Sequence, residues 1–375
     1  MLCLLISLAG VAQIKVRLLT SAKPTYVWFT VTSGQFFIKT SGTTHGSLQK
    51  GQTALLTLLK GKVVIKASDI SAFSIDSLEL VAADQSCIFR LGQGSPGRLQ
   101  GNYSGSLSCK PDMGSLLLIN TTDIEKYIAG VVKAEGGGGR LTEYFKTQAV
   151  IARTYTYRYL DRHVHDHYNL CDDVHCQSYL GNVTDKLIND AVTATAGDVI
   201  VTSDSILIIA AFHSNCGGET SPSEYAWMMS LPYLKKVNDP YCLNSRNARW
   251  VKTIPLGDWE NALESNGYKK PADRVDSYDF NQETRQADYI KGSFRLPFRD
   301  LRNTLDLRSA WFSVLTKGDS VTLAGKGYGH GVGLCQEGAM EMARLGSPFD
   351  EIIRFYYPGV TIIKIGDVKK TAAPR

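Results

Sequence analysis

The chain has 375 residues, of which 43% are hydrophobic and 21% are charged. This composition is ordinary for a globular protein with one or two hydrophobic cores, and it excludes a disordered or fibrous chain. The net charge of +5 is small, and the basic residues are scattered rather than grouped. The sequence therefore predicts no nucleic-acid partner, although a mildly basic surface suits an anionic cell envelope.

The first twelve residues form an apolar stretch that ends in Gly10, Val11 and Ala12. An apolar run that ends in small residues is typical of a secretory signal, although no positively charged segment precedes it here. The alternative is a buried N-terminal strand. We expect residues 1–12 to be a signal peptide and the mature protein to be exported, to the periplasm or cell envelope. No other segment is apolar enough to predict a transmembrane segment.

The front of the chain is rich in short segments in which apolar and polar residues alternate, separated by glycine and serine turns. This alternation is typical of β-strands. The expected strands cover residues 14–18, 26–32, 36–38, 63–65 and 115–119. We interpret the fold class as α+β. The expected organisation is a β-rich N-terminal region (13–95), a mixed α/β catalytic domain (96–365) and a C-terminal tail (366–375).

Helical patterns begin where this strand-rich part ends. Ile124, Ile128 and Val131 are spaced by four and three residues, and Glu135 follows four residues later. This spacing places all four on one face of a helix that starts after the N-cap candidates at 121–123. The glycines that follow Glu135 predict its end. Further helices are expected from about residue 142 to 163, over 190–195 and over 334–345, with another opened by Ser347-Pro348.

The second half of the chain alternates strands, turns and glycine-rich loops. Strands are expected over residues 199–202, 206–212 and 320–324, the second of which delivers residues 213–218 at its end. Residues 244–320 show no chemical motif, and we expect an insertion or lobe of the same domain there.

Glu135 is the first candidate for chemistry. A carboxylate that continues an apolar helical stripe is partly desolvated, which suits it to donate a proton near neutral pH. The alternative is a glutamate at a frayed helix end that points into solvent.

A second candidate is the cluster of histidines and cysteines in HVHDHYNLCDDVHC, residues 163–176. His165, Cys171, His175 and Cys176 supply two imidazoles and two thiols, the donor set of a tetrahedral structural zinc site. His163 or His167 could replace His165 as the fourth ligand, and a polar loop without metal is the alternative.

Removal of Cys3 with the signal leaves seven cysteines, an odd number that argues against complete pairing in an exported protein. Cys87 with Cys109, and Cys216 with Cys242, could each close a loop of about twenty residues if the geometry permits.

The glycine loop GKGYGHGVG, residues 325–333, lacks the ending of a phosphate-binding loop and does not open a strand–helix unit near the N-terminus. Nucleotide binding is therefore not expected. The glycines around Tyr328 and His330 allow close backbone approach to a flat ligand such as a sugar ring, or form a tight turn.

These segments, in this order, resemble the stage II sporulation protein D family, also called the SpoIID/LytB family. The resemblance covers roughly residues 95–365. The matching stretches are GRLQGNYSGSLSC (97–109), LLLINTTDIEKYIAGVVKAE (116–135), EYFKTQAVIARTYTY (143–157), YNLCDDVHCQSYLG (168–181), AFHSNCGGETSPSEYAW (211–227), LPYLKKVNDPYC (231–242) and GYGHGVGLCQEGAMEMA (327–343).

The resemblance implies a peptidoglycan lytic transglycosylase that cuts between N-acetylmuramic acid and N-acetylglucosamine and leaves 1,6-anhydro ends. It implies Glu135 as the acid and base, with Lys146 and Arg153 as basic catalytic partners. It assigns structural zinc to Cys171, His175 and Cys176, and less directly to His165. The expected substrate-binding residues are Gln177, Ser214, Gly217, Gly218, Tyr233, Tyr328, His330, Gly331 and Gln336.

Two departures from the family pattern stand out. Gly136 and Gly137 replace the usual Met-Pro after the glutamate, and Cys335 stands where the family often has a small polar residue. The implied partners are peptidoglycan glycan strands and a cell-wall amidase. The alternatives are a non-catalytic, glycan-binding amidase enhancer and a zinc hydrolase, which would need an open metal coordination site.

Overall fold

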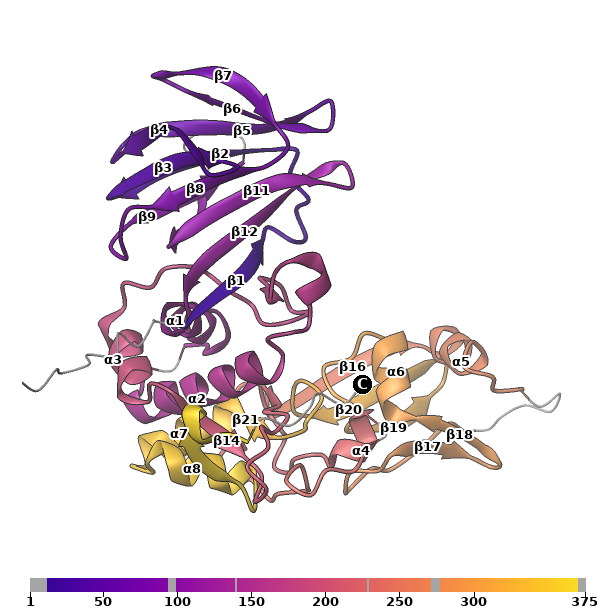
Figure 1. Cartoon of the computed structure of the whole chain (residues 1–375). Helices are drawn as coiled ribbons and strands as arrows, with labels where there is room; N and C mark the ends of the chain where they lie inside the picture. Colours follow the sequence, from indigo (N-terminus) through magenta and orange to yellow (C-terminus); the bar gives the residue numbers. More distant parts are fainter. Residues whose placement is uncertain (1–11, 94–98, 139, 228, 271–276, 370–375) are drawn as a thin grey trace, which may run out of the picture. The chain divides into compact units, whose positions relative to one another are not determined.

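The computed structural model describes residues 12–93, 99–138, 140–227, 229–270 and 277–369 (Figure 1). The chain forms two compact units, one of residues 1–138 and 148–197 and the other of residues 139–147 and 198–375. The α+β fold class is confirmed. The signal-peptide prediction, apart from Ala12, and the expected boundary at residues 95 and 96 lie outside the described residues, as does most of the expected tail.

The first unit is built on two sheets of mostly antiparallel strands (Figure 1). One has the order β13 (Leu170–Cys171), β1 (Gln13–Leu18), β12 (Ser115–Asp123), β11 (Ser106–Asp112), β8 (Leu78–Ala82), β3 (Gln35–Thr40) and β4 (Thr43–Gln49). The other has the order β10 (Leu99–Ser104), β9 (Ile88–Gly92), β2 (Tyr26–Ser33), β5 (Thr53–Leu59), β6 (Lys62–Ala67) and β7 (Ile70–Ile75).

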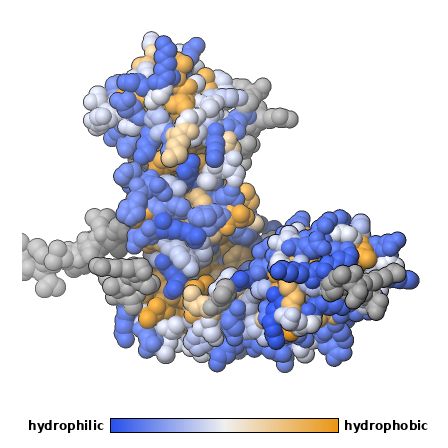
Figure 2. Space-filling view, turned by 90° about the vertical axis from the view of Figure 1, so that its right-hand side faces the viewer, coloured by the Kyte–Doolittle hydropathy of each residue, from blue (hydrophilic) through white to orange (hydrophobic). Residues whose placement is uncertain are grey.

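The two sheets pack face to face because the strands bury every second side chain. Phe29 and Phe89 of one sheet contact Phe36 of the other, with ring centroids 5.2 and 5.7 Å apart, and all three are fully buried. The alternation that predicted these strands therefore marks their core-facing positions. On the face shown in Figure 2, hydrophilic residues cover most of the surface, as expected when the apolar side chains lie in the cores.

Helix α1 (Ile124–Glu135) follows β12 directly. Asp123 caps it by accepting a hydrogen bond from the Lys126 amide at 2.9 Å, and Ile124, Ile128 and Val131 are buried as the spacing predicted. The helix ends at Glu135, before the glycines, and the Gly136 amide still donates to the carbonyl of Val132.

Helices α2 (Thr142–Arg158) and α3 (Lys186–Ala194) follow. The expectation that α2 reaches residue 163 is wrong, because the chain turns after Arg158. The side-chain amide of Asn169 donates to the carbonyl of Leu160 at 2.8 Å, and the Arg162 amide closes a turn onto Tyr159. This turn leads into the short 3-10 helix η1 (Val164–Asp166).

A glycine inside α1 lets the segment after β13 pack against the helix. A Cβ at Gly130 would lie 2.4 Å from the Tyr179 ring and 2.5 Å from the Gly181 carbonyl oxygen. Tyr179 is buried and its ring lies 4.9 Å from that of Tyr127 on α1. A side chain at position 130 would therefore push residues 179–181 away from α1.

An ion pair between a buried arginine and a half-buried glutamate joins α1, α2 and α3. Arg153 of α2 is fully buried, and its Nε and Nη2 donate to the two carboxylate oxygens of Glu125 at 2.9 and 2.6 Å. Glu125 lies in the first turn of α1 and also accepts from the Gly197 amide at 3.2 Å. Arg153 Nη2 donates to the carbonyl of Val192 in α3 at 3.4 Å. The pair thus sets how α1 lies against its neighbours.

The second unit contains small sheets and five complete α-helices among its described residues. Its elements are β14 (Asp198–Val201), β15 (Phe212–His213), α4 (Ser223–Trp227), β16 (Arg249–Pro255), α5 (Leu256–Glu264), β17 (Asp288–Lys291), β18 (Phe294–Pro297), α6 (Phe298–Thr304), β19 (Phe312–Lys317), β20 (Ser320–Lys326), β21 (Leu334–Cys335), α7 (Gln336–Arg344), α8 (Phe349–Tyr356), β22 (Thr361–Lys364) and η2 (Ile365–Asp367), together with the start of α2. Strand β14 pairs with β22, and β15 with β21.

The motif-free stretch at 244–320 forms a lobe with its own core. Strands β16, β20 and β19 make an antiparallel sheet, against which α5, α6 and the β17–β18 hairpin pack. The centre of this core is aromatic, with Trp259, Tyr289 and Phe298 fully buried. Within the described residues, no helix combines the length and the apolarity needed to cross a membrane.

Arg153→Met should destabilise the α1–α2–α3 group by about 2 kcal/mol, because it removes two charge-assisted hydrogen bonds and leaves the half-buried Glu125 carboxylate without its partner. Hydrogen exchange of the amides in these helices measures the change. The matched control is Lys186→Ala, which breaks the exposed pair Lys186–Asp190 and should cost less than about 0.5 kcal/mol. Equal losses in the two variants would contradict a structural role for Arg153.

Candidate functional site

Glu135 is the last residue of α1 and is half-buried. Its Oε1 accepts a hydrogen bond from the backbone amide of Ser178 at 2.8 Å. The carboxylate is therefore held by a main-chain donor, whose position does not depend on a side-chain rotamer. This contact links the end of α1 to the segment of residues 163–178, which contains Cys171 and Cys176.

Four side chains of that segment converge, which we call the first cluster: His163, Cys171, His175 and Cys176. Their ligand atoms all lie within 4.8 Å of one another. His175 Nδ1 lies 3.7 Å from Cys171 Sγ and 3.6 Å from Cys176 Sγ. A tetrahedral zinc ion separates a sulfur from a nitrogen ligand by roughly 3.6 Å, so the donor set fits this metal.

The fourth donor is His163, not the expected His165. His163 Nε2 lies 3.5 Å from Cys176 Sγ, and its Nδ1 lies 3.4 Å from a carboxylate oxygen of Asp166. A carboxylate on the second ring nitrogen is the usual support of a histidine ligand. Residues three apart share a side of a 3-10 turn, so Asp166 lies beside His163, whereas His165 is exposed and outside the cluster. His167, the other alternative, is also exposed.

The segment that connects the first cluster to Ser178, the hydrogen-bond donor of Glu135, is short and held in place by its contacts. Cys176 is buried, Gln177 follows, and Ser178 supplies the amide that holds Glu135. Gln177 is buried too, and its Oε1 accepts from the Thr156 hydroxyl of α2 at 3.1 Å. Gln177 was expected to bind substrate, whereas the structure places it in the interior, where it ties the loop to α2.

The two basic residues expected beside Glu135 are bound by other carboxylates. Lys146 donates to Glu143 Oε1 at 2.7 Å, and Glu143 Oε2 accepts from the Phe349 amide at 2.9 Å. Arg153 is buried against Glu125 as described above. Both residues lie on α2, and the structure gives Arg153 a positioning role, because a fully buried guanidinium does not reach a substrate surface.

In the second unit, the two glycine-rich segments run beside each other. Strand β15 pairs with β21, and Asn215 forms a bridge with Tyr328. Gly217 has a φ of +75°, and a Cβ there would lie 2.9 Å from the Gly327 amide nitrogen. Gly331 has a φ of +81°, and its Cβ would lie 2.9 Å from the Arg285 guanidinium. Gly217 thus permits close approach of the two loops, and Gly331 permits close approach of the Arg285 side chain.

Around these loops, the remaining expected substrate-binding residues differ in exposure. Tyr328 is 45% exposed. Tyr233 is buried, and its hydroxyl accepts from the Ile209 amide at 3.1 Å. Ser214, Gly218 and Gln336 are half-buried, and Gln336 begins α7. Tyr328 therefore presents the largest accessible surface of this group.

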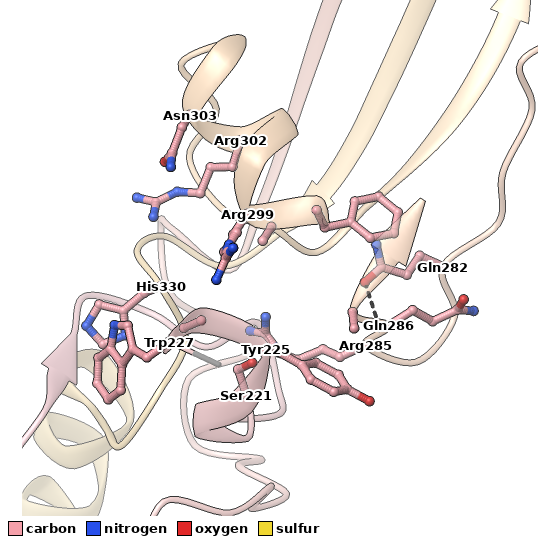
Figure 3. A pocket seen from close by; sticks show the side chains of 14 residues that line it. Ser221, Tyr225, Trp227, Gln282, Arg285, Gln286, Arg299, Arg302, Asn303 and His330 are labelled. Atoms are coloured by element: carbon pink, nitrogen blue, oxygen red, sulfur yellow. Dashed lines mark hydrogen bonds between the residues drawn. The ribbon is translucent and has the colours of Figure 1, made fainter. Parts of the chain in front are cut away.

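A pocket in the second unit combines aromatic rings with guanidinium groups (Figure 3). His330 lies at one side, with its ring 5.5 Å from Trp227. Arg299 and Arg302 extend from α6 toward the pocket, and Arg285 lies across from them. Aromatic faces and guanidinium groups suit a sugar that carries a carboxylate. Sequence reasoning missed these arginines because they lie in the motif-free lobe.

His330 and His213 form a pair of neutral imidazoles with ring centroids 5.5 Å apart. Burial, with the charge of Arg302 next in effect, lowers the pKa of His330 to about 4. Burial also lowers the pKa of His213, whose Nδ1 donates to the Val332 carbonyl at 3.1 Å. Both rings therefore stay uncharged near neutral pH.

Comparisons with known proteins place the chain in a family. A family model described as Stage II sporulation protein matches residues 112–201, which include Glu135 and the first cluster. Stage II sporulation protein D of Bacillus amyloliquefaciens is 30% identical over 264 residues, covering 65% of this chain and 75% of that protein. The chain belongs to the stage II sporulation protein D family.

Two further relatives extend the comparison. An uncharacterized protein of Brachyspira hyodysenteriae is 30% identical over 282 residues, covering 72% of this chain and 75% of that protein. The amidase enhancer of Bacillus subtilis is 30% identical over 292 residues, covering 63% of this chain and 40% of that protein. The resemblance of the sequence motifs to the stage II sporulation protein D family is thus confirmed over most of the chain.

Between pH 6.5 and 4, the free energy of unfolding should fall as the pH falls, because the unfolded chain binds a proton at position 330 and the folded chain does not. His330→Gln should make this dependence shallower. Urea titrations followed by tryptophan fluorescence measure it, with the exposed His45→Gln as control. An unchanged slope in His330→Gln would show that His330 is not held neutral by the fold.

Proposed function

We propose that this chain is an exported peptidoglycan lytic transglycosylase with Glu135 as its general acid and base. It would cleave the bond from N-acetylmuramic acid to N-acetylglucosamine and leave 1,6-anhydro-N-acetylmuramic acid ends. The observation that supports this most is the carboxylate at the end of α1, held by the Ser178 amide two residues after Cys176. Membership of the stage II sporulation protein D family supports the same assignment.

The proposed reaction needs one proton donor at the glycosidic oxygen. The Ser178 amide donates to Glu135 Oε1, so the transferable proton would sit on Oε2. Oε2 gives this proton to the leaving oxygen as the C1–O bond breaks. The C6 hydroxyl of the same muramic acid residue then attacks C1, and the Glu135 carboxylate takes the hydroxyl proton. No water is consumed, and the carboxyl group returns to its starting state.

This chemistry requires only one carboxyl group. A hydrolase of the usual kind needs a second carboxylate, which either activates water or attacks the sugar. An intramolecular hydroxyl replaces that second group, because it is already held beside C1. Glu125 pairs with Arg153 and Glu143 pairs with Lys146, so these two carboxylates are engaged in structural contacts.

The first cluster would hold a structural zinc ion. Its two thiols and two imidazoles complete a tetrahedron, so no position is left for a water molecule to be activated. Such a closed site argues against a zinc hydrolase. Bound zinc would fix Cys176, and through Ser178 it would fix the amide that positions Glu135.

The amidase enhancer of Bacillus subtilis supports a second candidate function. A non-catalytic protein of this kind would bind glycan strands and stimulate a cell-wall amidase. The half-buried Glu135 would then have no chemical task. Substitution of Glu135 separates the two candidates.

Glu135→Gln should lower the rate of anhydro-product formation from purified glycan strands by at least about 100-fold, because the amide cannot transfer a proton. Product analysis by mass spectrometry gives the rate. Glu264→Gln is the matched control, since Glu264 also ends a helix, α5, and is exposed. It should leave the rate unchanged.

Two results would count against the proposal. Glu135→Gln that keeps more than about a tenth of the wild-type rate would exclude Glu135 as the essential acid. A wild-type chain that is inactive on glycan but stimulates an amidase, with Glu135→Gln stimulating equally, would establish the enhancer function instead.

His163→Ala should lose one zinc equivalent per chain relative to wild type, while His165→Ala keeps the wild-type content, because His163 belongs to the first cluster and His165 does not. Elemental analysis of protein purified without added metal measures this. The first variant should also melt at a lower temperature, since structural zinc contributes to folding. Zinc loss in His165→Ala alone would contradict the ligand set.

A further inference from the structure

A second group of metal-ligating side chains lies in the second unit, and it shares no residue with the first cluster. Cys216, Asp239, Cys242 and Cys335 are each fully buried. Their ligand atoms all lie within 4.8 Å of one another. From this convergence we propose that these four residues form a second, structural zinc site.

The separations between the donors fit a tetrahedral ion. Cys216 Sγ lies 3.4 Å from Cys242 Sγ and 3.1 Å from Asp239 Oδ2. Zinc bonds of about 2.3 Å to sulfur and about 2.0 Å to oxygen give ligand separations of roughly 3.8 Å between sulfurs and 3.5 Å between sulfur and oxygen. Small outward shifts of the side chains would admit the ion. Three thiolates with one carboxylate favour zinc among the common divalent metals.

The surroundings of Cys335 suit a sulfur that binds a metal ion. Its Sγ accepts hydrogen bonds from the backbone amides of Cys216 at 3.3 Å and Gly338 at 3.4 Å. Cys335 is also the N-cap of α7, a position that favours negative charge. Backbone amides and a helix N-terminus stabilise a metal-bound thiolate in the same way.

Asp239 provides an independent argument. Its carboxylate is fully buried, and within the described residues it makes no ion pair. Oδ1 accepts from the Tyr241 amide at 2.9 Å, and Oδ2 accepts from the Tyr356 hydroxyl at 3.0 Å. Hydrogen bonds of this kind orient a carboxylate ligand, and a cation would offset the cost of burying its charge.

The packing of α7 against this second cluster leaves no room for a side chain at position 338. A Cβ at Gly338 would lie 2.4 Å from Asp239 Oδ2 and 2.2 Å from the Tyr356 hydroxyl. Arg285 adds a positive charge nearby, since its Nη2 donates to the Cys216 carbonyl at 2.7 Å. This charge would partly balance a zinc ion that carries four anionic ligands.

The site would be closed and structural, because four protein ligands fill a tetrahedron. It would join the loop after β15, the turn at 239–242 and the start of α7. Ser214, Gly217 and Gln336, three of the residues expected to bind substrate, lie within two residues of its ligands in the chain. The ion would thus fix the positions of these loops, and this role does not depend on the proposed reaction.

A disulfide between Cys216 and Cys242 is the competing state. The two sulfurs lie 3.4 Å apart, longer than the bond of about 2.05 Å in a disulfide. All seven described cysteines are free. A disulfide would also leave the amide contacts of Cys335 and the burial of Asp239 unexplained.

Zinc content and X-ray absorption of the full-length chain, purified under reducing conditions without added metal, test the proposal. Cys335→Ser should hold one zinc equivalent fewer than wild type. Cys109→Ser is the matched control, since Cys109 is buried outside both clusters, and it should keep the wild-type content. Cys171→Ser, which removes a ligand of the first cluster, should retain zinc bound by three sulfurs and one oxygen.

The X-ray absorption spectrum of the wild-type chain tests the proposed site even where a variant does not fold. The first cluster offers only two sulfurs, so more than two sulfur ligands per zinc require the second cluster. Two sulfurs per zinc, an absence of zinc from folded Cys171→Ser, iron in place of zinc, or a Cys216–Cys242 disulfide in peptide mass mapping would each overturn the proposal.

Discussion

The hydrogen bond from the Ser178 amide to Glu135 Oε1 is the contact on which the candidate site depends. It joins the C-terminal end of α1 to the loop that carries Cys171 and Cys176. The glycines that follow Glu135 would otherwise leave this end of the helix free to fray. The loop is fixed on one side by Gln177, which bonds to α2, and on the other by Tyr179, which fits against Gly130 of α1. The carboxylate is therefore placed by several elements together.

The orientation of α1 has its own support. Arg153 and Glu125 form an ion pair at the start of the helix, at the opposite end from the glycine turn. Such a pair contributes little net stability relative to apolar packing, but the loss of one partner is costly. Its value here is geometric, because a bidentate contact fixes both the position and the rotation of α1 and so the direction in which Glu135 leaves the helix.

Periodicity and donor chemistry were enough to predict part of this arrangement. The buried stripe of α1, with Glu135 at its end, followed from residue spacing, and Cys171, His175 and Cys176 followed from their donor types. The choice of His163 over His165 depends on a 3-10 turn, which three closely spaced histidines do not reveal. The Ser178 contact uses a backbone amide, so no residue type signals it. The second cluster draws ligands from residues 216 to 335, and only the fold brings them together.

The proposed function rests on an intramolecular attack assisted by one carboxyl group. The origin of the oxygen that becomes bonded to C1 distinguishes this reaction from hydrolysis. The most direct measurement is digestion of purified glycan strands in water enriched in oxygen-18, followed by mass spectrometry of the released ends. The proposed reaction gives 1,6-anhydro ends that carry no label, because the C6 hydroxyl supplies the oxygen. Labelled reducing ends would contradict it, since they require water as the nucleophile.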